Sequence, residues 1–153
     1  MKNAAEFDKQ LRRSIAIQAV RAAYGGPVPY WVENGLAVMH LFTLLKGCTE
    51  EKPNPVGLKD AKAAVAKRAE TLAYFLDEVN PPPAGDEAEI TRVMWAWHYY
   101  LRAAPAAADE KARYEKYMDT LANAGDAEAA RAVWEGADFA ASRAAMIRWM
   151  QAR

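Results

Sequence analysis

The stretch MWAWHYYL, Met94–Leu101, decides the fold of this chain. It contains two of the five tryptophans and one of the two histidines. At about 100° per residue, Trp95 and Tyr99 share one face of a helix, whereas Trp97 and Leu101 share another. A helix that is apolar nearly all round lies at the centre of a fold or forms a contact surface.

Capping residues, glycines and prolines divide the rest of the chain into further helices. Asn3 and Glu6, for example, have the spacing of a capping box, which predicts a helix start. No segment alternates with period two, so we expect no sheet. The expected helices cover residues 3–24, 29–46, 55–80, 86–104, 109–125 and 126–136, and a last one begins at 138.

The predicted fold class is therefore all-α, a single-domain bundle of six or seven helices without sheet. One domain covers residues 1–153, with a candidate subdomain junction at 80–85, where three consecutive prolines interrupt the chain. In the first helix, Phe7, Leu11, Ile15 and Ala19 recur every four residues, which predicts a stripe facing the core. The residues expected to be buried in mutual contact are Phe42, Leu45, Leu72, Leu76, Val93 and Trp97.

Composition narrows the range of functions. The 20 basic and 20 acidic residues cancel, so no overall field attracts nucleic acid or an anionic membrane. The single cysteine, Cys48, excludes an internal disulfide framework. The start of the chain does not resemble a secretory signal, and no apolar run is long enough to cross a bilayer, so we expect a cytoplasmic location.

The residues that could carry chemistry are few. His40 and His98 fall on different expected helices, and neither belongs to a Glu-x-x-His pair, so we expect no metal, no cofactor and no catalytic residue. One alternative is a helical domain that binds or transforms a small molecule in a pocket around Glu33, His40 and His98. Glu33 and His40 are seven residues apart and therefore share a helix face.

A second alternative is DNA binding through the last two helices. Gly136 lies in a short turn, and Arg143, Arg148 and Arg153 follow it, as in a helix-turn-helix. Glu135 then occupies a position that this motif buries, which counts against the alternative.

The leading hypothesis is a non-enzymatic module that binds another protein as an adaptor, assembly factor or inhibitor. Tryptophan and tyrosine are enriched at binding hot spots, and this chain carries more of them than one small core is expected to hide. An accessory protein of a phage or mobile element that inhibits a host complex fits this profile. We expect neither nucleic acid nor membrane as partner, whereas homo-oligomerisation is compatible with the sequence.

The expected binding surface lies on the aromatic helix. Tyr99 and Tyr100 point about 100° apart, and the all-round apolar second helix is expected to take the enclosed central position. At least one of Trp95, Tyr99 and Tyr100 is therefore expected to be exposed, with Arg92 or Arg102 at the rim of the patch.

Overall fold

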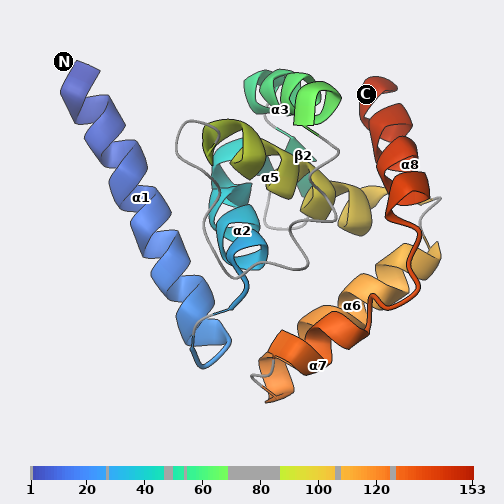
Figure 1. The fold of residues 1–153 in the computed structure, drawn as a ribbon. Coiled ribbons are helices and arrows are strands. Elements are labelled where there is room, and N and C mark those ends of the chain that lie inside the picture. Colours follow the sequence, from blue (N-terminus) through green and yellow to red (C-terminus); the bar gives the residue numbers. More distant parts are fainter. Residues whose placement is uncertain are drawn as a thin grey trace.

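Seven helices make up most of the described protein (Figure 1). The computed structural model describes residues 2–26, 28–46, 50–53, 55–68, 87–105, 108–124 and 127–153. The all-α class is confirmed, and the described residues form seven helices, in line with the expected six or seven. The helices are α1 (Lys2–Ala23), α2 (Tyr30–Phe42), α3 (Pro55–Arg68), α5 (Glu87–Ala103), α6 (Ala108–Ala124), α7 (Ala127–Ala132) and α8 (Phe139–Gln151).

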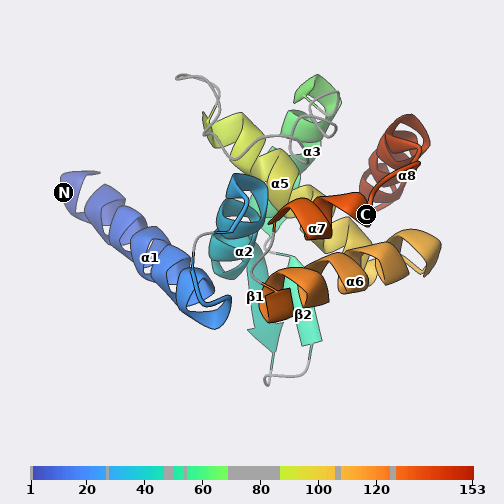
Figure 2. The ribbon, with the colours of Figure 1, turned by 60° about the horizontal axis from the view of Figure 1, so that its bottom comes forward.

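A small hairpin departs from the expectation of no sheet. Strands β1 (Thr43–Lys46) and β2 (Glu50–Pro53) pair antiparallel, and the hairpin projects beyond the helices (Figure 2). Helix α2 therefore ends at Phe42 instead of continuing to Lys46. Four residues per strand are too few to show the period-two alternation that identifies a strand.

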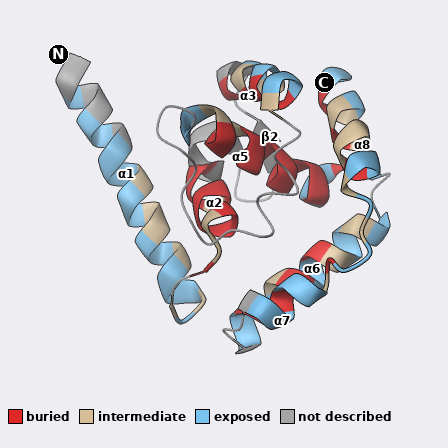
Figure 3. Cartoon of the chain, viewed as in Figure 1, coloured by how far each residue is buried: buried red, intermediate tan, exposed pale blue. Residues whose placement is uncertain are grey.

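Helix α5 occupies the centre of the bundle. It contacts α2, α3, α6 and α8, and every residue from Ile90 to Leu101 except Arg92 is buried (Figure 3). On α3, Ala61 and Ala64 are buried, and such small side chains let α3 approach α5 closely. The aromatic helix is thus the enclosed element, a position that we expected α2 to occupy.

Two of the six side chains predicted for the core fall in the described part of the chain. Val93 and Trp97 are buried, as expected. The other expected core positions, namely the side chains of Phe42 and Leu45 together with Leu72 and Leu76, lie outside the described residues. The same holds for the expected helix beyond Arg68 and for the junction at 80–85.

The prediction for the first helix is wrong about which face turns inward. Phe7, Leu11 and Ile15 are 67%, 47% and 60% exposed. Helix α1 packs on α2 through the opposite side, where Ile17 and Val20 are partly buried. Both sides of α1 carry apolar residues, so periodicity alone did not distinguish them. Most of the described surface of α1 is accessible (Figure 3).

Candidate functional site

The expected aromatic patch is not a surface. Trp95 is fully buried, and Tyr99 and Tyr100 are each 3% exposed, so the expectation that at least one of them is exposed is wrong. Trp95 stacks on Tyr99 with ring centroids 5.2 Å apart, and Trp149 of α8 covers both tyrosines. These side chains find neighbours in every direction because four helices surround α5.

The two arginines expected at the rim remain near the surface. The guanidinium of Arg92 lies 3.4 Å from the carboxylate of Asp60, which links α5 to α3. Arg102 is exposed. Neither borders an exposed aromatic patch, because the three aromatic candidates lie in the core.

His98 is a core residue with both ring nitrogens engaged. Its Nδ1 lies 2.7 Å from the hydroxyl of Tyr114, its Nε2 lies 3.4 Å from the backbone oxygen of Trp31, and its ring stacks on Trp31 at 4.7 Å. Burial lowers the pKa of His98 to about 3, so the ring is neutral near pH 7. Since a carbonyl oxygen only accepts, Nε2 donates to Trp31 and Nδ1 accepts from Tyr114. This histidine is suited to packing rather than to proton transfer.

Glu33 lies on a different side of α2 from His98. Its carboxylate accepts from the Nε and Nη2 atoms of Arg21 on α1, the latter at 3.1 Å. His98 instead packs against Gly35, which is about 200° further round the helix than Glu33. The structure therefore does not bring Glu33 and His98 into one pocket, and the side chain of His40 lies outside the described residues.

A polar clamp holds α1 on the body of the protein. The Nη2 of Arg13 donates to Asn34 at 2.6 Å and to Glu87 at 2.8 Å, in addition to the ion pair between Arg21 and Glu33. We call these five residues the α1 clamp. The hydrogen bond and the charge of Glu33 both raise the pKa of Arg21.

The α1 clamp lies beside an open cleft of about 410 Å³ between α1, α2 and the start of α5. Its charged lining groups, Arg13, Glu33 and Glu87, already have partners within the protein. Arg13 pairs with Glu87 and Glu33 pairs with Arg21, and these contacts explain how α1 is oriented and why its opposite side faces solvent.

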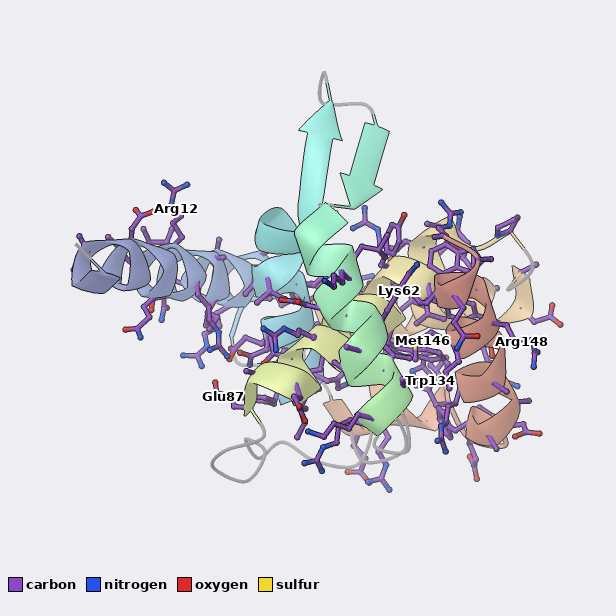
Figure 4. All side chains as sticks on the ribbon, turned by 90° about the horizontal axis from the view of Figure 1, so that it is seen from above. Arg12, Lys62, Glu87, Trp134, Met146 and Arg148 are labelled. Atoms are coloured by element: carbon purple, nitrogen blue, oxygen red, sulfur yellow. The ribbon has the colours of Figure 1, made fainter. Side chains whose placement is uncertain are left out.

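The last two helices pack on different neighbours. Helix α7 contacts α6, whereas α8 packs on α3 and α5. The buried residues of α8 are Ser142, Met146 and Met150, and Ser142 donates a hydrogen bond to Glu110 of α6. Met146 points inward from α8 and Arg148 points outward (Figure 4). Asp138 accepts from the backbone N–H of Ala141 and caps α8, as its position predicts. Helix α8 therefore packs against α5 as a core helix.

The one extended apolar surface formed by large side chains in the described residues is the outer face of α1. We use this name for the stripe of Phe7, Leu11 and Ile15, which are the large hydrophobic side chains exposed in the described part of the chain. The sequence pattern identified this stripe but assigned it to the core. A signal for the correct assignment was available in Arg13, which lies on the other side of the helix from Leu11 and can form an ion pair with a neighbour.

Comparison with protein-family models, with curated proteins and with solved structures finds no match to this chain. Among the described residues, no histidine, cysteine, aspartate and glutamate side chains gather in a group of three or more that could hold a metal ion. The same residues contain no helix with the length and apolar character needed to span a membrane.

Proposed function

We propose that this protein is a non-enzymatic binding module that recognises another protein through the outer face of α1, as an adaptor, assembly factor or inhibitor. The observation that carries the proposal is the exposure of Phe7, Leu11 and Ile15 on a helix whose other side is held by the α1 clamp. Leaving three large apolar side chains in water is unfavourable, and a partner that covers them recovers that free energy.

The geometry favours a partner that presents an apolar helix. The three side chains follow one another at intervals of four residues, so they form a narrow stripe about 12 Å long. A stripe of this kind fits the apolar face of another helix, as in helix-in-groove and coiled-coil recognition. The α1 clamp supports this role because it fixes the direction in which the stripe points.

Position-specific crosslinking tests the proposal. A photoreactive benzoylphenylalanine at position 7 should crosslink to a defined partner in extracts of the source cells, whereas the same group at the exposed Ala140 of α8 should not. Leu11→Glu should abolish the crosslink from position 7 without changing the unfolding midpoint, since Leu11 lies on the surface. Equal crosslinking from both positions, or crosslinking that survives Leu11→Glu, would show that the outer face of α1 is not the binding surface.

A further inference from the structure

We infer that the outer face of α1 pairs with the same face of a second copy of this chain, in an antiparallel arrangement. This inference rests on the proposed function, because it names the partner for the surface described there. Two features of α1 support this pairing: the apolar stripe is symmetric, and the charges beside it complement those of a second copy.

The apolar stripe is symmetric about its middle residue. Leu11 is four residues from both Phe7 and Ile15. When two copies of α1 pair antiparallel about a two-fold axis at Leu11, Leu11 meets Leu11 and Phe7 meets Ile15 of the other copy. A surface that contacts itself in this way is the pattern of a two-fold symmetric dimer.

The charges beside the stripe favour the antiparallel direction. Asp8 and Arg12 lie along one edge of the outer face, form an ion pair at 2.8 Å and are more than half exposed. Arg12 projects away from the other helices (Figure 4). In an antiparallel pair of helices this edge meets its own copy, and Asp8 of one chain comes within about 3 Å, measured along the axis, of Arg12 of the other. In a parallel pair of helices, the edge with Asp8 and Arg12 would meet the opposite edge of the other copy, which carries the uncharged Gln10 and Ser14.

The rest of the protein leaves room for this contact. Helix α2 packs on the other side of α1, so the two bodies lie on opposite sides of the helix pair. Three large side chains per copy make a contact smaller than the roughly 1,200–2,000 Å² of stable interfaces, so we expect a weak dimer that dissociates on dilution.

Sedimentation velocity over a range of concentrations measures the self-association. Leu11→Glu places two carboxylates at the two-fold axis and should weaken the dimer roughly tenfold or more, whereas Ala140→Glu on α8 should leave it unchanged. Asp8→Arg should weaken the dimer, and adding Arg12→Asp should restore it because the exchanged charges again face each other. A chain that remains monomeric at every concentration would overturn the inference.

Cysteine crosslinking tests the register, in a background with Cys48→Ser. Leu11→Cys should form a disulfide with its own copy. Phe7→Cys should not, because the two positions lie about 12 Å apart along the axis, but it should crosslink to a chain carrying Ile15→Cys. Self-crosslinking of Phe7→Cys would indicate a parallel pair and overturn the arrangement. If the chain is monomeric but Leu11→Glu abolishes binding to a different protein, the self-pairing is refuted and the proposed function stands.

Discussion

Replacing Gly35 by alanine probes the contact between α2 and α5 directly. Gly35 lies inside α2, where alanine is normally the better residue by about 1 kcal/mol. A Cβ at this position would lie 2.2 Å from Cδ2 and 2.6 Å from Nε2 of His98. The imidazole has no space to withdraw, because it is fully buried, stacks on Trp31 and is hydrogen-bonded to Tyr114.

The expected cost is set by two losses and one gain. Overpacking a core by one methyl group costs about 1–3 kcal/mol. Displacing His98 from Tyr114 leaves buried polar groups without partners, which costs about 1–3 kcal/mol more. After subtracting the helix propensity, Gly35→Ala should lower the free energy of unfolding by about 3 kcal/mol, or the melting temperature by about 6–12 °C.

Urea unfolding followed by tryptophan fluorescence measures this change. Gly26→Ala is the matched control, since no atom lies within 4 Å of a Cβ added there, and its effect should be within about 0.5 kcal/mol. In a background with His98→Ala, Gly35→Ala should cost much less, because the side chain it meets has been removed. If Gly35→Ala is neutral or stabilising in the wild-type background, α2 and α5 do not pack as described.

Three further predictions follow from the same core and from the α1 clamp. Burial lowers the pKa of His98 from 6.5 to about 3, so the unfolded state takes up a proton before the folded state does as the pH falls. The stability that depends on a neutral, buried His98 is therefore complete above pH 6.5 and is lost as the pH falls towards 3. Between pH 7 and pH 5 the loss should be about 2 kcal/mol in urea unfolding, and it should disappear in His98→Asn. Tyr99→Ala and Tyr100→Ala should each lower the free energy of unfolding by about 3–5 kcal/mol, because both rings are buried, and unfolding midpoints near wild type would contradict the enclosed position of α5. Glu33→Gln combined with Glu87→Gln should speed hydrogen–deuterium exchange across α1 several-fold while α5 is unaffected, and unchanged exchange in α1 would show that apolar contacts alone hold it.

The positions of the described helices could be predicted well from local signals. The expected helix 86–104 corresponds to α5, and 109–125 corresponds to α6 within one residue at each end. The start of α8 after Asp138 is also as expected. Helix boundaries are predictable because caps and prolines act on backbone groups within about four residues of themselves. The hairpin was missed because its strands have only four residues each, too few to show the period-two alternation that identifies a strand.

The candidate site could be predicted only in part. The stripe of Phe7, Leu11 and Ile15 is evident from periodicity, but its exposure is not, because α1 also carries Ile17 and Val20 on the other side. Conversely, the aromatic helix was correctly identified as either central or a contact surface, and the expectation that part of it is exposed was wrong.

The sequence by itself determined that the chain is helical, where most described helices begin and end, and that the segment around Trp97 is apolar on all sides. Tertiary structure decided that α5 rather than α2 is enclosed and that His98 packs against Gly35. It also decided that α1 turns its clamp inward and its apolar stripe outward. The physical reason is that a helix satisfies its backbone hydrogen bonds within four residues, whereas burial depends on side chains contributed by distant segments.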